Sequence, residues 1–341
     1  MKKLLEVKNL KTHFFTMGET VKSVDGVSFD VYEGETFGLV GESGCGKSQT
    51  CRSILRLIKK PGKIVEGQIL YKGKDLVSMN DRQMRQIRGR EIAAIFQEPM
   101  TSLNPVLKIK KQILEVFDDT DMTAQQKSDR ALELLKLVGI PAPEQRLEDY
   151  PHQFSGGMRQ RAMIAIALGA KPKLLIADEP TTALDVTIQD QIMSLINELK
   201  SKLDMSVILV THDMGIIAQM CDRVAIMYAG HIVEMADTVT LFAKPRHPYT
   251  YALMGSIPDP DRAGAVLKTI DGTPPDLGNL PPGCPFAKRC PYKIDRCLEE
   301  NPVLSEYEEN HLVSCHCMDK ASHFEGIIPV SRINGQEGRA E

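Results

Sequence analysis

A glycine-rich loop between an apolar run and a helical pattern constrains this chain more than any other feature. Residues 36–40 predict a buried strand, and residues 54–58 carry apolar side chains at helical spacing. Between them stands the sequence Gly41-Glu42-Ser43-Gly44-Cys45-Gly46-Lys47-Ser48. Such a loop turns backbone N–H groups inward around a phosphate, and the following helix adds positive potential. The flanking strand and helix favour nucleotide binding over a plain glycine turn. Lys47 would contact the outer phosphates, and Ser48 would bind Mg²⁺.

A second apolar strand, residues 174–177, leads into the carboxylates Asp178 and Glu179. Ligands bind at the carboxyl ends of the strands in open α/β sheets. We therefore expect Asp178 to hold Mg²⁺ through water, and Glu179 to accept a proton from an attacking water. A further strand, residues 206–211, ends at His212. A histidine at a strand end is often structural, but here we predict a phosphate contact.

A helix with two glycines at its start follows the sequence Phe154-Ser155-Gly156-Gly157. Ser155 is a suitable N-cap for the small apolar residues that continue to Ala170. One interpretation is a capped helix that packs closely on a neighbour. The other is a second anion site, directed at a phosphate that this chain's own glycine loop does not hold.

The remaining patterns outline the rest of the chain. Residues 4–15 and 27–31 predict antiparallel strands, in which Phe14 is either a core residue or a platform that stacks on adenine. A helical pattern over residues 107–138 predicts an inserted helical subdomain, at about 100–160. We expect the first domain to span residues 1–260 and a proline-rich extension to follow at 261–341.

Charge and hydropathy restrict the class of protein. The net charge is −3, with both signs well mixed, so a nucleic-acid partner is not expected. The apolar run 162–170 is far shorter than the roughly 20 residues of a membrane span. The first residues lack the apolar core of a signal peptide, so we expect a cytosolic chain without disulfides.

Taken in order, the glycine loop, Gln97, the Gly156-Gly157 helix, Asp178-Glu179, Asp185 and His212 closely resemble an ABC-type ATPase. The resemblance covers residues 4 to about 250. It implies an α/β P-loop fold with a RecA-like parallel-sheet core, an antiparallel β edge and an inserted helical subdomain. It also implies a head-to-tail dimer, in which Ser155, Gly156 and Gly157 engage the γ-phosphate of ATP bound to the opposite subunit.

The same resemblance assigns roles to the other motif residues. It implies that Gln97 senses Mg²⁺, the attacking water and the membrane partner. Asp185 would lie at the subunit contact, and His212 would clamp the γ-phosphate near Glu179. Met158-Arg159 stands where many members have Gln-Gln, which leaves the two glycines of the helix intact.

Three stretches resemble the ATPases of bacterial peptide importers, a group that includes dipeptide, oligopeptide and nickel systems. They are residues 97–105, residues 245–250 and the tail, with Pro282-Gly283-Cys284-Pro285-Phe286 and Arg289-Cys290-Pro291. The resemblance implies a peripheral protein on the cytoplasmic face of the membrane. Its partners would be a second, non-identical ATPase, two membrane subunits and an external binding protein. Alternatives are a nickel importer ATPase, a soluble ABC ATPase of DNA repair or translation, and a metal-binding regulatory module.

Five cysteines crowd into the extension, with little apolar sequence around them. They are Cys284, Cys290, Cys297, Cys315 and Cys317. Four thiolates suit either zinc or a [4Fe–4S] cluster, and a segment so poor in core would gain order from a metal centre. The resemblance to peptide importers favours the cluster, held by Cys284, Cys290, Cys297 and Cys315. Zinc and a metal-free set remain alternatives, and Cys317 could replace Cys315.

Overall fold

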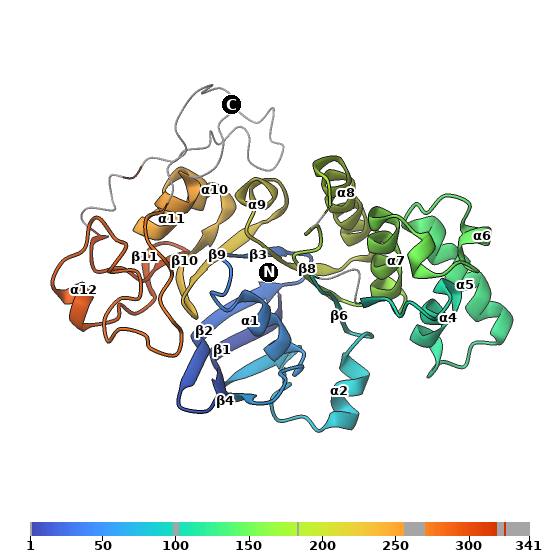
Figure 1. Ribbon diagram of the computed structural model, residues 1–341, viewed down its shortest axis with the longest axis horizontal. Coiled ribbons are helices and arrows are strands. Elements are labelled where there is room, and N and C mark those ends of the chain that lie inside the picture. Colours follow the sequence, from blue (N-terminus) through green and yellow to red (C-terminus); the bar gives the residue numbers. More distant parts are fainter. Residues whose placement is uncertain (1, 98–101, 183, 256–269, 319–323, 325–341) are drawn as a thin grey trace. The chain divides into compact units, whose positions relative to one another are not determined.

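The computed structural model describes residues 2–97, 102–182, 184–255, 270–318 and 324. The chain divides into two compact units, one of Met1–Ser78 with Val210–Glu341 and the other of Met79–Leu209. Figure 1 traces the elements of each unit along the chain. The predicted domain boundary near residue 260 lies outside the described residues.

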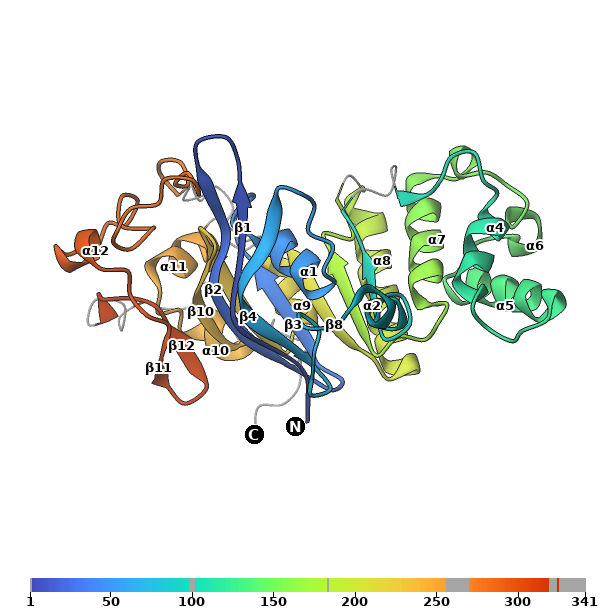
Figure 2. The same cartoon turned by 90° about the horizontal axis from the view of Figure 1, so that it is seen from below.

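An antiparallel sheet forms the N-terminal part of the first unit, as the alternating residues predict. Strand β1 (Lys3–Phe15) pairs with β2 (Thr20–Tyr32) and with β4 (Gly62–Tyr71), and β4 pairs with β5 (Lys74–Asp75). Figure 2 shows β1, β2 and β4 side by side. One face is buried, with Leu5, Val7 and Leu10 of β1 at most 1% exposed.

The other strands of the first unit surround the glycine loop. Strand β3 (Thr36–Val40) is buried at every residue and runs parallel to β9 (Arg223–Tyr228), which turns back antiparallel into β10 (His231–Asp237). Two strands of the extension continue this pairing, since β12 (His311–Val313) lies against β10 and β11 (Ser305–Glu308) against β12. The extension is therefore part of the sheet, where the sequence predicts only loops.

Three of the five helices described in the first unit begin at a side-chain cap. The five are α1 (Lys47–Ile54), α9 (Met214–Met220), α10 (Thr238–Ala243), α11 (Pro248–Met254) and α12 (Arg296–Glu299). Asp213 and Asp237 accept hydrogen bonds from the first turns of α9 and α10. The His247 side chain caps α11 in the same way. These caps satisfy backbone donors that the helix itself leaves without partners.

The second unit contains the strands that carry the predicted acids. Strand β6 (Ile92–Ile95) runs parallel to β7 (Leu174–Asp178), and β8 (Ser206–Thr211) is the other neighbour of β7. All residues of β7 are buried. An apolar run of this kind is typical of a parallel strand covered on both faces.

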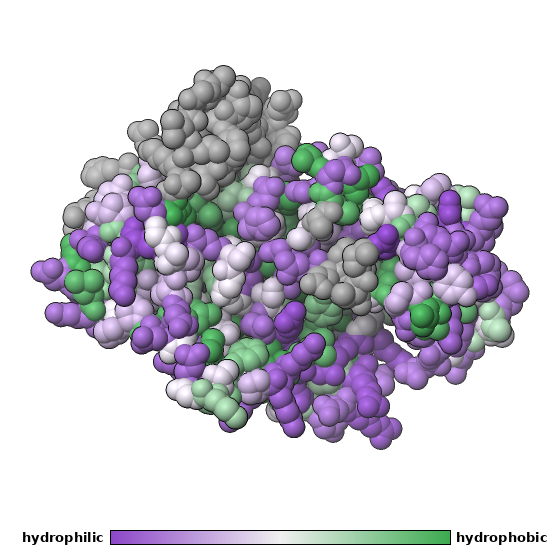
Figure 3. Space-filling model, in the orientation of Figure 1, coloured by the Kyte–Doolittle hydropathy of each residue, from purple (hydrophilic) through white to green (hydrophobic). Residues whose placement is uncertain are grey.

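Helices make up most of the second unit. They are α2 (Asp81–Ile87), α4 (Ile109–Leu114), η1 (Glu115–Phe117), α5 (Ala124–Leu137), α6 (Pro143–Arg146), η2 (Pro151–Gln153), α7 (Gly156–Leu168) and α8 (Val186–Leu203). Those from α4 to η2 fall within the predicted helical region of about 100–160. Hydrophilic side chains cover much of the surface around α5 and α6 in Figure 3. Among the described residues, no helix is long and apolar enough to cross a membrane.

Candidate functional site

The glycine loop has the backbone that its sequence predicts. It joins buried β3 to α1, and Gly46 at the helix start has a φ of 109°. A Cβ atom at Gly46 would meet the backbone carbonyl of Ser23, and one at Gly41 would meet that of Met227. Both positions therefore require glycine, because neither backbone carbonyl can move aside as a flexible side chain could.

Lys47 is held inside this loop. Its side chain is 4% exposed, and its ammonium donates to the backbone carbonyls of Gly41 (2.7 Å) and Glu42 (3.0 Å). Ser48 follows on the first turn of α1 and is half-buried. Burial raises the pKa of the Cys45 thiol, so this cysteine is a neutral packing residue of the loop rather than a reactive thiolate.

Phe14 lies near the end of β1 and is half-buried. Its ring lies against Gly62 of β4, and a Cβ atom at that glycine would overlap it. Part of the ring is thus packed on the sheet, and part is accessible.

In the second unit, Gln97 and Glu179 meet directly. Gln97 Nε2 donates to Glu179 Oε2 at 2.7 Å, and the Thr182 hydroxyl donates to the same oxygen at 2.9 Å. Asp178, one residue earlier, is 1% exposed at the end of β7. The sequence analysis named Gln97 and Glu179 as site residues but predicted neither their contact nor the part played by Thr182.

Glu179 also has an unusual backbone. Its φ is 48°, in the left-handed region that residues with a Cβ atom seldom adopt. Such a conformation costs on the order of 1 kcal/mol or more and persists where surrounding structure imposes it. The strand end and the following turn thus fix the direction of this carboxylate.

The two-glycine helix begins as predicted. Ser155 Oγ accepts a hydrogen bond from the Met158 N–H at 3.3 Å, and the helix runs over Gly156–Leu168. Its glycines pack closely on another segment, because a Cβ atom at Gly156 would approach Leu184 and one at Gly157 would crowd Ile188 of α8. Ser155 and Gly156 are nevertheless exposed. Close packing and an accessible helix start therefore occur together.

Asp185 and His212 each lie next to the end of a helix or strand. Asp185 is the N-cap of α8 and accepts a hydrogen bond from the Ile188 N–H at 2.9 Å. His212 comes directly after β8 and is exposed.

The predicted residues are divided between the units: the glycine loop and His212 belong to one, and Gln97, Glu179 and the two-glycine helix to the other. Residues 98–101 of the expected membrane-partner segment lie outside the described part.

Four of the five cysteines of the extension gather in one small apolar cluster. None of the eight cysteines, all of which lie in the described part of the chain, forms a disulfide. Cys297 and Cys317 are each 5% exposed, with their Sγ atoms 3.7 Å apart, and Cys284 and Cys315 pack against them. Burial raises the pKa of Cys284 to about 11 and that of Cys315 to about 12, and neighbouring thiols add to both shifts. Among the described residues, no three His, Cys, Asp or Glu side chains are arranged around one metal position.

Two family models match this chain. The model described as "ABC transporter" matches residues 24–182, and the model described as "Oligopeptide/dipeptide transporter, C-terminal region" matches residues 233–297. The second match covers β10, α11 and the cysteine turns up to Cys297.

Similar proteins of nearly equal length agree with both models. The dipeptide transport ATP-binding protein DppD of Bacillus subtilis (strain 168) is 52% identical over 95% of this chain and 97% of its own. The oligopeptide transport ATP-binding protein OppD of the same organism is 51% identical over 91% and 88%. A dimeric structure of the ATP-binding cassette MJ0796, in a post-hydrolysis state bound to ADP and Pi, has a TM-score of 0.62 and 28% identity, and the match covers 69% of this chain and 98% of that one.

Proposed function

The chain belongs to the family of ATP-binding subunits of bacterial oligopeptide and dipeptide ABC transporters, and from that premise we propose that it hydrolyses ATP to drive peptide import. The observation that carries this proposal is similarity over nearly the whole chain, including the C-terminal region specific to these transporters. That region favours peptide over nickel as cargo, and it disfavours a role in DNA repair or translation.

We assign the phosphates of ATP to the glycine loop, Gly41–Ser48, and to the N-terminus of α1. Inward N–H groups and the Lys47 ammonium neutralise phosphate charge there. Hydroxyl and carboxylate oxygens are the hard ligands that suit Mg²⁺, so Ser48 and Asp178 are its expected holders. When bound, Mg²⁺ lowers the charge on the terminal phosphates. Phe14 would stack on the adenine with the accessible part of its ring.

Glu179 is the proposed general base. Its carboxylate already receives hydrogen bonds from Gln97 and Thr182, and these fix its direction toward an attacking water. His212 would contact the γ-phosphate as the bond breaks. Phosphoryl transfer leaves little covalent chemistry to the protein, so catalysis rests on positioning and electrostatics.

Two ATPase subunits would enclose the nucleotides. The MJ0796 cassette is dimeric, and we infer a similar pairing with the exposed Ser155-Gly156-Gly157 helix start facing the partner's ATP and Asp185 at the contact. We further propose that the second ATPase is non-identical. Two membrane subunits and an external binding protein would complete the transporter, with this chain on the cytoplasmic face and residues 97–105 gripping a membrane subunit.

Glu179→Gln tests the catalytic proposal. We expect ATP binding to persist and hydrolysis to fall by roughly 10²- to 10⁴-fold, because the base is removed while the phosphate contacts remain. Glu198→Gln on α8 is a matched control in the same unit, since Glu198 makes an exposed ion pair with Lys202. Unchanged hydrolysis in Glu179→Gln would remove Glu179 from this role, and a wild-type chain that binds no ATP would refute the function itself.

We also propose that the cysteine cluster holds a [4Fe–4S] centre. The donors fit in kind and number: five thiols lie in the extension, and Cys297 and Cys317 are already in contact. Cys284, Cys290, Cys297 and either Cys315 or Cys317 would hold the cluster. When bound, the cluster would cross-link the extension through iron–sulfur bonds.

Anaerobic purification tests this second proposal. A brown protein with iron and sulfide each at about four per chain would support the cluster. Stoichiometric zinc or a colourless metal-free protein would overturn it. Cys297→Ser should lose the iron while Cys221→Ser, in the ATPase body, should retain it. Separate serine variants of Cys315 and Cys317 would identify the fourth ligand, because only the ligand's loss should lower the iron content.

A further inference from the structure

One arginine of the extension uses every hydrogen-bond donor of its side chain. A guanidinium carries five N–H donors. Arg289 Nε donates to the Asp271 carbonyl (2.9 Å), Nη1 to Glu42 Oε2 (2.7 Å) and to Tyr228 Oη (3.2 Å), and Nη2 to Glu42 Oε1 (2.9 Å) and to the Ile270 carbonyl (3.2 Å). The side chain is 5% exposed. A buried charge so fully satisfied is held in one position.

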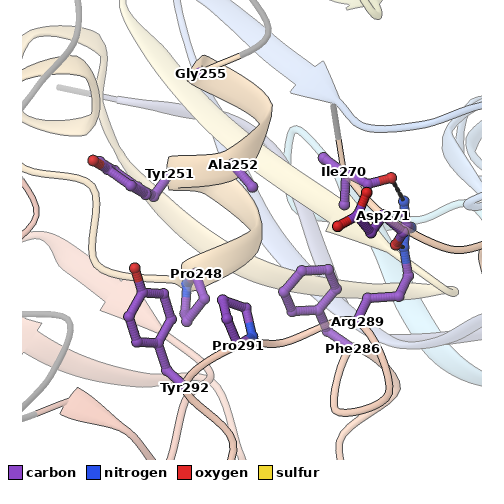
Figure 4. Close-up of a pocket in the computed structure, with 10 residues that line it drawn as sticks. All are labelled: Pro248, Tyr251, Ala252, Gly255, Ile270, Asp271, Phe286, Arg289, Pro291 and Tyr292. Carbon is purple, nitrogen blue, oxygen red and sulfur yellow. Dashed lines mark hydrogen bonds between the residues drawn. The ribbon is translucent and has the colours of Figure 1, made fainter. Parts of the chain in front are cut away.

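The aromatic residues around Arg289 make that position rigid. The rings of Tyr228, Tyr249 and Phe286 lie within 4.7–5.4 Å of one another, and each is at most 2% exposed. Arg289 also forms part of the wall of a cavity of about 240 Å³ beside α11, where Figure 4 shows its side chain extending past Phe286 toward Ile270 and Asp271. Because hydrogen bonds and the rings of Tyr228 and Phe286 hold it, Arg289 can transmit the position of the extension.

The other end of this contact is the second residue of the glycine loop. The Glu42 carboxylate makes a two-pronged ion pair with Arg289, across 247 positions of sequence. The Glu42 N–H donates to Tyr249 Oη at 2.9 Å, and its carbonyl accepts from Lys47 Nζ at 3.0 Å. All three polar groups of Glu42 are therefore engaged. Two of them are held from outside the loop.

Both outside restraints come from the C-terminal region. Tyr249 and Arg289 lie within residues 233–297, which match the oligopeptide/dipeptide transporter model, whereas Glu42 lies within the general ABC transporter match. Glu42 occupies a position that the G-x-x-x-x-G-K-S pattern leaves unspecified. Phosphate binding by itself does not require this glutamate, so its restraint is an addition to the loop.

We propose that Arg289 is a positioning residue for the phosphate-binding loop and that the extension sets the affinity for ATP through it; this rests on the proposed function. Two effects act together. The ion pair fixes Glu42 and hence the carbonyl that Lys47 contacts. It also neutralises a carboxylate that would otherwise repel the phosphates of ATP, an effect that is strong where side chains are sheltered from water.

The test measures ATP affinity and steady-state hydrolysis of the full chain with Mg²⁺. Arg289→Ala should raise the Kd and the KM for ATP roughly tenfold, because a charge-assisted pair is lost, while kcat stays within about twofold. Arg289→Lys should lie between, since an ammonium cannot make the two-pronged contact. Arg296→Ala is the control. That arginine belongs to the same extension but pairs with Glu300 at the surface, and its loss should leave the Kd unchanged.

A double-mutant cycle separates positioning from general damage. In Arg289→Ala the bare Glu42 carboxylate repels ATP, so adding Glu42→Gln should recover part of the lost affinity. If Arg289→Ala instead disordered the extension, adding Glu42→Gln would not restore the ATP affinity. If Arg289→Ala does not fold, Arg289→Lys tests the same pair, because it keeps a cation but loses the two-pronged contact, and it should weaken binding on its own.

The outcomes are distinct. If the wild-type chain binds ATP and Arg289→Ala binds it equally well, the positioning role is overturned and the proposed function stands. Weakened binding that Glu42→Gln fails to suppress would likewise overturn it in favour of a general structural role. A wild-type chain without ATP affinity would overturn the proposed function instead.

Discussion

The glycine loop and the cysteine-bearing extension lie in the same unit but are stabilised in opposite ways. The loop sits between elements of a continuous apolar core, with every residue of β3 buried and β9 buried after its first residue. The described part of the extension, residues 270–318 and 324, has two short strands, one short helix and a small cysteine cluster. Its place therefore depends on polar anchors to the rest of the unit, and Arg289 is one of them.

Glu234 is the second anchor. Its side chain is fully buried on β10. One carboxylate oxygen accepts from the Arg246 N–H (2.6 Å) and from His311 Nε2 (2.7 Å), and the other accepts from the His247 N–H (2.9 Å). The same carboxylate thus fixes the start of α11 and strand β12. A segment with little hydrophobic core is thus held in position by a few buried charges. Single polar substitutions at those charges should therefore disturb it strongly.

The largest expected effect comes from a pair of glycine substitutions, one in each region. Gly46→Ala should cost more than about 4 kcal/mol and abolish ATP binding, because a Cβ atom would meet the Ser23 carbonyl at a positive φ. Gly283→Ala in the extension also meets backbone, at Cys297 and Leu298, but without a positive φ. ATP affinity by calorimetry and thermal unfolding measure both.

Gly283→Ala should weaken ATP binding to the extent that Arg289→Ala does, without abolishing it. Gly73→Ala is a control for the positive φ alone, since open space surrounds that glycine. Equal loss of ATP binding in Gly46→Ala and Gly283→Ala would contradict the expectation that the loop binds ATP directly and the extension acts only through the loop.

Removing the anchor charge should have the next largest effect. In Glu234→Gln, either orientation of the amide turns its NH₂ group toward a backbone N–H, of Arg246 or of His247. A buried donor then lacks an acceptor, and we expect a loss of about 3 kcal/mol in the free energy of unfolding. Denaturant titration measures it. Glu309→Gln, an exposed acid beside β12, should change the stability by much less.

These anchors mark the limit of what the sequence predicts. The glycine loop, the cap Ser155 and the acids at the end of β7 follow from local patterns, because short-range backbone geometry dictates the residues. The N-cap role of Asp185 was found only in the structure. Arg289–Glu42 and His311–Glu234 join residues 247 and 77 positions apart. A single polar pair at such a separation leaves no periodic signal in the chain.

The strands of the extension escaped prediction for a related reason. Strand β11 is exposed along its whole length and reads Ser-Glu-Tyr-Glu, without the apolar alternation of a half-buried strand. Its position follows from pairing with β12, which in turn follows from β10. Thr182 was missed because its role depends on the left-handed turn at Glu179, and a sequence pattern does not display that conformation.

A pH dependence should appear at the junction of the two regions. Burial lowers the pKa of His247 to about 3, while its Nδ1 accepts a hydrogen bond from the Tyr249 N–H. The folded state thus holds a neutral ring, whereas the unfolded chain binds a proton near pH 6.5. Stability is present above that pH and is lost as the pH falls through 6.5 toward 3. Between pH 7 and 5 the loss is about 2 kcal/mol.

Chemical denaturation of wild type and His247→Asn at several pH values isolates this effect. Asparagine keeps a cap acceptor but does not titrate, so the stability difference between the two proteins should shrink as the pH falls. Glu234 and Arg246 face the same helix start and are present in both proteins, so their contributions cancel in that difference. A difference that stays constant with pH would show that His247 does not titrate as its burial implies.

The smallest change in stability should come from breaking an exposed ion pair of the extension, in contrast to its buried ion pairs. Arg296 and Glu300 form an i,i+4 pair with side chains 61% and 54% exposed. Water and salt screen such a pair, and ordering two long side chains offsets the attraction. Arg296→Ala should therefore leave the unfolding temperature unchanged within error at any ionic strength, measured beside Arg289→Ala by differential scanning fluorimetry. A salt-dependent loss in Arg296→Ala would mean that surface charges also hold the extension. The division between buried anchors and solvated surface would then fail.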